Sequence, residues 1–496
     1  MDRGSWFYKR FTEHFHYDKT ADQDRLFSDM ADFIVDDDHD ILVINGYAGT
    51  GKTTAVSAVI EALDELRPVK DDVPEEICIL LAPTGRAAKV LSLYSGKPAR
   101  TIHKCIYRQK SVGADGFGQF SLAPNRMSHK LFIVDEVSLI GSRSPVPELV
   151  EGAGGAVFGT GDLLRDLVQF VRNGNDCRLI MIGDSAQLPP VGLDASPALS
   201  SSFMESFGGV RYSTLTEVVR QQKESGILHN ATRLRKMIAA DPFGTEEYSF
   251  SDLGLRTEGF DDVVRITGGE LLDTLNQAYF SEYSKDDAVV LCRSNKRANR
   301  YNAGIRAQVF YDEERIVRGE KLMIVKNCYQ FTGGVEGMDY IANGDIAKLV
   351  SIRNHEERYG LHFADARLSF PDYDDAEITA KVCLDTLDSE APSLTYEQQN
   401  QLYQGVNEDY SHINTKKKRW EAVREDPYFN ALQLKYANAI TCHKSQGGQW
   451  SCVFIDNPFW VDPLTVDDLK WLYTAMTRAV EKVYLVNFKD ECFEGR

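Results

Sequence analysis

A glycine-rich stretch near the N-terminus has the spacing of a phosphate-binding loop. Residues 46–53 read Gly-Tyr-Ala-Gly-Thr-Gly-Lys-Thr, after the apolar run 41–44 and before a helix predicted over 54–66. Glycines let the backbone wrap closely around a phosphate chain, so that successive N–H groups and the helix N-terminus face the anion. A strand, this loop and a helix in that order predict a nucleotide-binding P-loop, with Lys52 at the β- and γ-phosphates and the Thr53 hydroxyl on Mg²⁺. The residues expected to contact the nucleotide are Gly46, Ala48, Gly49, Thr50, Gly51, Lys52, Thr53 and Thr54.

Two further apolar runs end in polar residues that suit phosphate chemistry. The run 131–134 leads into Asp135 and Glu136, the arrangement of a Walker B motif. We expect Asp135 to hold Mg²⁺ and Glu136 to orient and deprotonate the attacking water. The run 179–182 leads into Asp184 and Gln187, side chains that can sense a γ-phosphate and transmit its loss. Downstream of a P-loop, these patterns predict a nucleotide hydrolase.

Two single residues are weaker candidates for nucleotide contacts. Gln23 lies in the first turn of a helix for which Thr20 is the predicted N-cap. Its amide has the geometry to pair with an adenine edge, although a helix glutamine is usually just solvated. Arg220 is a candidate arginine finger, with an ordinary surface arginine as the alternative.

The charge of the chain is unevenly distributed. Its 496 residues carry a formal net charge of −18, which argues against a protein that simply coats nucleic acid. Residues 86–110 nevertheless hold seven basic and no acidic residues, and residues 293–306 hold five basic and none acidic. Both windows are candidate phosphate-tracking stripes, with an ordinary solvated face as the alternative. The first begins in the segment 83–88, at the end of a strand predicted over 77–82, where ligands bind in open α/β sheets.

The composition places the chain among packed, soluble proteins of a reducing compartment. The hydrophobic fraction is 43%, and no run is long and apolar enough to span a bilayer. Residues 1–17 mix aromatics with charges and lack the apolar core of a signal peptide. The nine cysteines are scattered and include no Cys-x-x-Cys pair, which favours a cytoplasmic location and argues against a structural zinc site.

The remaining segments indicate further modules. Residues 106–127 alternate apolar and polar types around a glycine-rich tip, which predicts a β-hairpin. Its Phe117 and Phe120 can act as a wedge against bases or fill a small hairpin core, and the sequence does not separate the two. A second α/β block begins near 288–292 and resumes near Tyr436. Between these points, short β-like pieces predict an inserted β-barrel; they cover 321–325, 345–352 and 366–370.

Taken in order, these motifs resemble those of the superfamily 1 helicases, and especially the RecD-like and Dda-like enzymes of superfamily 1B. The resemblance runs from about Thr20 to Val486. Arg220 stands in Val-Val-Arg-Gln, without the aromatic that precedes it in many superfamily 1A enzymes, which favours the 1B assignment. The resemblance implies two RecA-like P-loop domains in tandem, an inserted β-hairpin pin and an SH3-like accessory barrel. It also implies ATP and Mg²⁺ as cofactors and 5′→3′ movement on single-stranded DNA.

The same resemblance assigns roles to individual residues. Lys52, Asp135, Glu136, Gln187, Arg220 and Arg478 match the catalytic residues, and the two arginines would reach the phosphates from the second domain. Gln23 matches the residue that reads adenine, and Gly447 belongs to a motif next to the nucleotide. The residues expected to contact nucleic acid are Thr84, Gly85, Arg86, Thr101, His103, Phe117, Asn295, Thr441 and His443.

The expected organisation follows from these assignments. The first RecA-like domain covers 1–213 and contains the pin at 104–129. The second covers 214–314 and 432–496, and the SH3-like barrel with a helical extension covers 315–431. The expected partners are single-stranded DNA and its junctions with duplex, without a membrane, and this architecture can work as a monomer.

Three other functions fit the same residues. One is an ATP-driven translocase that strips proteins from DNA without unwinding it. Another is a superfamily 1A helicase that moves 3′→5′. A third is a nucleotide-gated binding module without turnover, against which the intact set of catalytic residues argues.

Overall fold

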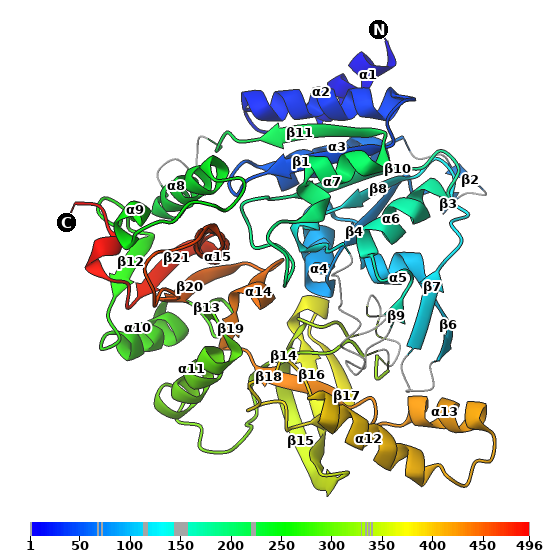
Figure 1. The fold of residues 1–496 in the computed structure, drawn as a ribbon, viewed down its shortest axis with the longest axis vertical. Coiled ribbons are helices and arrows are strands. Elements are labelled where there is room, and N and C mark those ends of the chain that lie inside the picture. Colours follow the sequence, from blue (N-terminus) through cyan, green and yellow to red (C-terminus); the bar gives the residue numbers. More distant parts are fainter. Residues whose placement is uncertain are drawn as a thin grey trace.

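Two α/β units and a barrel make up the fold (Figure 1). The computed structural model describes residues 2–66, 69–70, 73–112, 118–142, 157–219, 225–328, 330–332, 335, 338 and 341–495. Within these residues it contains a six-stranded sheet, a five-stranded sheet and a closed five-stranded barrel. The expected fold class is therefore confirmed.

Six parallel strands form the first sheet, in the order β11-β1-β10-β8-β4-β5. They are β1 (Ile41–Gly46), β4 (Cys78–Ala82), β5 (Ala99–Thr101), β8 (Leu131–Val134), β10 (Arg178–Gly183) and β11 (Val210–Leu215). Because the strands are parallel, the P-loop, the Walker B carboxyls and Asp184 all follow strands at one edge of the sheet. The boundary expected at 213 is wrong, since β11 pairs with β1 as far as Leu215.

Helices cover both faces of this sheet, as a buried parallel sheet requires. They are α1 (Arg3–Glu13), α2 (Ala21–Val35), α3 (Lys52–Asp64), α4 (Gly85–Ser95), α5 (Ile102–Ile106), α6 (Leu163–Arg172) and α7 (Ser201–Met204). Leu42 and Ile44 pack into the core shared with α1, α2 and α3, whereas Ile41 and Val43 face the core that holds α6. The alternation along β1 thus decides which helices lie on which face.

The predicted β-hairpin is present at the edge of this unit. It consists of β6 (Tyr107–Val112) and β7 (Gly118–Leu122), and β9 (Val157–Phe158) adds a parallel strand to β7. Phe120 packs against the core of the first unit, so the structure favours its core role. The hairpin tip with Phe117 lies outside the described residues. A short strand pair, β2 (Val69–Lys70) and β3 (Val73–Pro74), lies elsewhere on this unit.

The second sheet is also parallel, with the strand order β12-β21-β20-β13-β19. Its strands are β12 (Val263–Ile266), β13 (Ala288–Cys292), β19 (Ala439–Thr441), β20 (Trp450–Asp456) and β21 (Ala479–Val486). Its helices are α8 (Gly226–Ala240), α9 (Phe250–Leu253), α10 (Leu271–Gln277), α11 (Asn295–Gln308), α14 (Cys442–Ser445) and α15 (Val466–Met476). Strands from before and after the barrel therefore form one sheet.

The inserted barrel closes through long-range strand pairing. Its strands are β14 (Lys321–Ile324), β15 (Ile346–Arg358), β16 (Leu361–Phe370), β17 (Ala376–Cys383) and β18 (Leu432–Tyr436). The boundary expected between 431 and 432 is wrong, because β18 pairs with β14 and β17 and its Leu432 and Leu434 lie in the barrel core. The second α/β unit resumes only after Tyr436.

A helical extension of the barrel contains the basic segment 416–420. It consists of α12 (Tyr396–Asp409) and α13 (Lys416–Glu425). Trp420 packs against Tyr403 and Phe429, with ring centroids 6.1 and 6.0 Å away. The tryptophan thus anchors α13 to the rest of the extension.

The described residues bear on what the sequence suggests about cysteines, metal sites and membrane-spanning helices. All nine cysteines lie in the described ranges and none of them forms a disulfide. Those ranges contain no group of three or more His, Cys, Asp or Glu residues arranged to hold a metal ion. A search of the same ranges finds no helix with the length and apolar character needed to cross a membrane.

Candidate nucleotide and nucleic-acid sites

The P-loop between β1 and α3 has the shape of a phosphate cradle. Gly49 and Gly51 have φ angles of 75° and 71°, which favour glycine. A Cβ at Gly46 would lie 2.9 Å from Cδ of Lys52, so glycine leaves room for the lysine side chain. The Gly49 carbonyl accepts the Val219 N–H at 3.0 Å. Since the first N–H groups of α3 have no helical partners, the loop suits a bound anion.

Gln23 supports this loop from α2. Its side chain is buried, and its carbonyl accepts the Thr20 N–H at 3.0 Å in a capping box. Its amide nitrogen donates to the Thr50 carbonyl at 3.0 Å. A Cβ at Gly51 would lie 2.5 Å from that nitrogen. The sequence did not reveal this bracing role, and the contact with adenine stays a prediction.

The Walker B carboxyls follow β8 in a strained turn. Glu136 has a φ of 52°, a left-handed conformation that is costly for a residue other than glycine and recurs at functional sites. Its N–H donates to Oδ1 of Asp135 at 2.8 Å. Burial and the adjacent Glu136 raise the pKa of Asp135, whereas the Lys52 ammonium lowers it. These interactions bring Lys52 and both carboxyls into one site, and the oxygen donors of Thr53 and Asp135 suit Mg²⁺.

The segment after β10 completes this side of the site. Asp184 is fully buried, and its burial raises its pKa, while Lys52 is the largest influence that lowers it. Its carboxylate accepts the Ala186 N–H at 2.9 Å and the Tyr473 hydroxyl at 2.6 Å. Gln187 is buried, and its Oε1 has no hydrogen-bond partner among the described residues. A buried carbonyl in that state is uncommon, which suits a group that meets water or a ligand.

Of the two predicted arginines, the structure describes only Arg478, and none of its described hydrogen bonds goes to the P-loop. Arg220 lies outside the described residues. Arg478 is buried, and its guanidinium donates to the carbonyls of Thr474 and Gly448 at 3.2 and 3.4 Å. Both partners belong to its own α/β unit. The role of Arg478 as an arginine finger stays a prediction that requires a different side-chain orientation.

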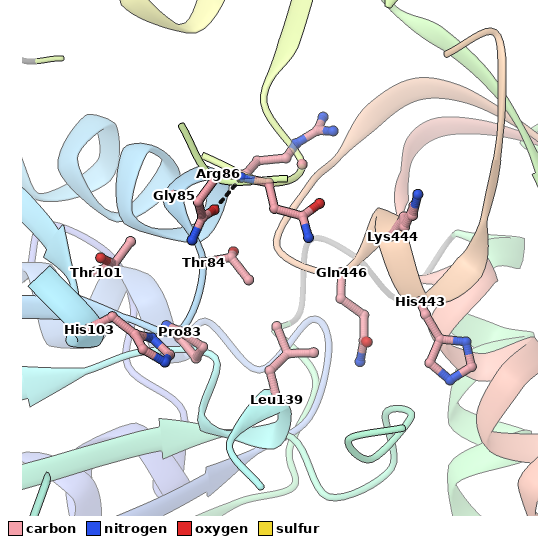
Figure 2. Close-up of a pocket in the computed structure, with 13 residues that line it drawn as sticks. Pro83, Thr84, Gly85, Arg86, Thr101, His103, Leu139, His443, Lys444 and Gln446 are labelled. Carbon is pink, nitrogen blue, oxygen red and sulfur yellow. Dashed lines mark hydrogen bonds between the residues drawn. The ribbon is translucent and has the colours of Figure 1, made fainter. Parts of the chain in front are cut away.

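A pocket of about 290 Å³ lies where both α/β units and the barrel meet (Figure 2). Its lining includes six of the residues expected to contact nucleic acid: Thr84, Gly85, Arg86, Thr101, His103 and His443. Pro83, Leu139, Asn327, Asn343, Gly344, Lys444 and Gln446 complete it. Figure 2 shows the residues of α4 and α5 on one side and those of α14 on the other. Segments far apart in the sequence thus share one cavity.

The two threonines of the pocket are helix caps. The Thr84 side chain accepts the Ala87 N–H at 3.2 Å at the start of α4, and Thr101 caps α5 in the same way. The N-terminus of α4 therefore faces the pocket, and its dipole favours a negative group there. Burial lowers the pKa of His103 and of His443, so both imidazoles are neutral at pH 7.

Arg86 has a more enclosed position than the sequence suggested. Its guanidinium lies 4.2 Å from the ring centroid of Trp450, in the second α/β unit. A Cβ at Gly448 would lie 2.6 Å from this guanidinium. A Cβ at Gly85 would lie 2.3 Å from Cβ of Ala342, so glycine lets the barrel approach α4. Arg86 thus joins the units as well as lining the pocket.

The remaining predicted contacts lie elsewhere. Thr441 and Asn295 do not line the pocket, and Phe117 is outside the described residues. Gly447 lies against α4, with its Cβ position 3.0 Å from Cβ of Ala87, and no described contact brings it to the P-loop. The second basic stripe is largely neutralised by ion pairs: Arg293–Asp468, Lys296–Glu390, Arg297–Asp456 and Arg306–Glu320. These pairs favour the structural alternative for 293–306.

Sequence reasoning predicted His443 of α14 at this site but missed Lys444 and the residues from the barrel. The Asn343 N–H donates to Oδ1 of Asn327 at 2.7 Å, and both asparagines line the pocket. Asn343 and Gly344 were recognisable only as a turn. Lys444 has a buried Nζ without a hydrogen-bond partner among the described residues, and burial lowers its pKa to about 8. The sequence signal that could have identified Lys444 was its position between Thr441, His443 and Gly447, which were predicted site residues.

Several known proteins are similar to this chain. A family model described as an AAA domain matches residues 27–163, and one described as a UvrD-like helicase C-terminal domain matches residues 436–486. The ATP-dependent DNA helicase dda of Enterobacteria phage T4 is 26% identical over 493 residues, covering 95% of this chain and 99% of that protein. The ATP-dependent RecD2 DNA helicase of Deinococcus radiodurans is 30% identical over 193 residues, covering 39% of this chain and 21% of that protein.

A crystal structure of the Pif1 helicase from Bacteroides aligns over 97% of this chain and 95% of its own, at 16% identity and a TM-score of 0.47. The two family models lie on the P-loop side of the first unit and on the second unit around α15. Together with the similarity to Dda along nearly the whole chain, they show that this protein is similar to the ATP-dependent DNA helicases Dda and RecD2.

Proposed function

We propose that this chain is an ATP-dependent DNA helicase that moves 5′→3′ along single-stranded DNA and unwinds duplex. The observation that carries the proposal is the pocket built jointly by both α/β units and the barrel. Any movement of one unit against the other changes that pocket, so nucleotide-driven closure can move a bound strand. The similarity to Dda and RecD2, which are both ATP-dependent DNA helicases, supports the same activity. The nine unpaired cysteines favour a reducing, cytoplasmic setting.

The residues at the sheet edge suit hydrolysis of a nucleoside triphosphate. Lys52 stabilises negative charge that builds on the phosphates, and Glu136 orients and deprotonates the attacking water. Thr53 and Asp135 would hold Mg²⁺, which when bound neutralises β- and γ-phosphate oxygens. The side-chain carbonyl of Gln187 has no hydrogen-bond partner among the described residues, and Gln187 stands in the chain between Asp184 and Leu188, which both bond to the second unit.

Strand displacement on two partial duplexes tests the proposal. One substrate carries a 5′ single-stranded tail and the other a 3′ tail, each with ATP and Mg²⁺, and Lys52→Ala is the control without turnover. We expect unwinding from the 5′ tail alone. Unwinding from the 3′ tail alone would keep the motor and overturn its direction. DNA-stimulated hydrolysis without displacement on either substrate would replace the helicase by a translocase that strips proteins.

The pocket lysine offers a test of DNA binding that does not depend on unwinding. Burial lowers the pKa of Lys444 to about 8, and a bound phosphate would raise it again. The contribution of Lys444 to affinity is therefore present below pH 8 and is lost as pH rises through the pKa of the bound state. We expect the affinity for single-stranded DNA to fall between pH 7 and pH 9, measured by fluorescence anisotropy.

Lys444→Gln should bind more weakly at pH 7 and lose this pH dependence. Its slope of log affinity against log salt should also fall by about one, the value for one lost phosphate contact. Lys236→Gln is the matched control, because Lys236 is exposed on α8 and away from the pocket lining. An unchanged salt slope and pH profile in Lys444→Gln would remove Lys444 from the DNA site.

A further inference from the structure

The hydroxyl of Tyr473 bridges the second α/β unit to two loops of the first. Tyr473 lies on α15 and its side chain is buried. Its hydroxyl donates to Oδ2 of Asp184 at 2.6 Å and accepts the Ala48 N–H of the P-loop at 2.9 Å. One atom thus touches the phosphate-binding loop and the segment after β10.

The same segment is held by the second unit at its other end. The Leu188 N–H donates to the Thr474 hydroxyl at 2.8 Å, and the Leu188 carbonyl accepts from the Gln446 amide at 2.8 Å. Gln446 also lines the pocket proposed for DNA. Residues 184–188 therefore run between a contact at the P-loop and a contact at the pocket. The segment connects the two sites through bonds that cross the interface between units.

Removing the hydroxyl oxygen of Tyr473 would break two hydrogen bonds between the α/β units. Asp184 and Tyr473 are both almost completely excluded from water. Without the Tyr473 hydroxyl, Oδ2 of Asp184 would lose its donor and, among the described residues, only the Ala186 N–H bond to Oδ1 would remain, with no solvent to replace the lost bond. The Ala48 N–H would lose its acceptor at the same time. A second contact flanks this one, since the Arg235 guanidinium of α8 lies 4.6 Å from the ring centroid of Tyr47.

We propose that Tyr473 is a positioning residue whose hydroxyl couples the state of the P-loop to the DNA pocket through residues 184–188. This inference rests on the proposed function for the identity of the two ligands. A ligand that alters the P-loop changes the Ala48 and Asp184 contacts, and residues 184–188 carry that change to Leu188, which bonds to Thr474 and to Gln446 at the pocket. By linkage, DNA in the pocket must then change the affinity for nucleotide by the same factor.

The test compares binding of single-stranded DNA with and without a non-hydrolysable ATP analogue. Coupled sites typically change affinity about 5–150-fold. In the wild type we expect the DNA affinities with and without the analogue to differ by at least about fivefold. In Tyr473→Phe, which keeps the ring and removes the hydroxyl, the ratio should fall to within about twofold of one. The kcat of DNA-stimulated hydrolysis should fall about tenfold, while KM for ATP should change less than about threefold.

Tyr279→Phe is the matched control, because the Tyr279 hydroxyl is buried with no hydrogen-bond partner among the described residues. It should leave the ratio unchanged. Thr474→Val removes the acceptor of the Leu188 N–H and keeps the side-chain shape. It should lower the ratio as Tyr473→Phe does. This second variant tests the proposal if Tyr473→Phe fails to fold. A wild-type ratio near one, or an unchanged ratio in folded Tyr473→Phe, overturns the proposal.

These outcomes are separate from those of the helicase assay. Loss of coupling in Tyr473→Phe supports the proposal even where the wild type displaces no strand. Unwinding from the 5′ tail by a Tyr473→Phe variant with intact coupling would keep the helicase and reject the role of Tyr473.

Discussion

Lys52→Ala is expected to lower DNA-stimulated ATP hydrolysis by at least about 10³-fold, because it removes the cation that stabilises charge on the transferring phosphoryl group. In the structure Lys52 begins α3 directly after the glycine turn, and its side chain passes the position where a Cβ of Gly46 would lie. Its ammonium lowers the pKa of both Asp135 and Asp184, the carboxyls that follow β8 and β10. Steady-state release of phosphate, with saturating single-stranded DNA, measures the effect.

The matched control for this variant is Lys236→Ala, an exposed lysine on α8. It should retain wild-type turnover, which separates the loss of the P-loop cation from the loss of one positive charge. A Lys52→Ala protein that keeps its thermal stability and hydrolyses ATP at a wild-type rate would refute the P-loop assignment.

Glu136→Gln is expected to separate binding from turnover. The substitution keeps the shape of the side chain and removes its ability to take a proton from water. General-base catalysis contributes about 10²–10⁴-fold, so kcat should fall by that factor. Affinities for ATP and for single-stranded DNA should stay within about threefold, because Glu136 is not expected to contact either of them in the ground state.

The structure makes this variant informative for a second reason. Glu136 adopts a left-handed backbone conformation with a φ of 52°, and its N–H donates to Asp135. Glutamine retains that backbone bond, so a loss of turnover would report the carboxylate itself. Equilibrium binding of a fluorescent nucleotide and phosphate release are the two measurements. Normal turnover with intact folding would remove Glu136 from the role of base.

The sequence by itself determined the parts of this protein that depend on local order. The P-loop, the Walker B carboxyls and the segment after β10 each follow a short apolar run, and those runs are buried strands. The N-cap at Thr20 was likewise predicted correctly, because a helix start depends on residues a few positions apart. Local patterns suffice here because adjacent residues make these structures.

Only the tertiary structure decided where distant segments meet. Strand β18 closes the barrel by pairing with β14 and β17, so the boundary drawn from composition at 431 was wrong. Asn327 and Asn343 reach the pocket because that barrel lies against α4, where Gly85 and Ala342 leave no space for a further Cβ. The hydrophobic periodicity of one segment does not indicate which distant segment it will contact.

The sequence also does not show which charged side chains are paired in the fold. The cations of 293–306 are arranged as a stripe in the sequence, yet the fold supplies an acidic partner to Arg293, Lys296, Arg297 and Arg306. Conversely, the sequence does not distinguish Tyr473 from the other buried residues of α15. Its hydroxyl bonds to Ala48 and Asp184 only because the two α/β units pack against each other. The sequence determined which chemistry is available, and the packing of remote segments decided which side chains take part in it.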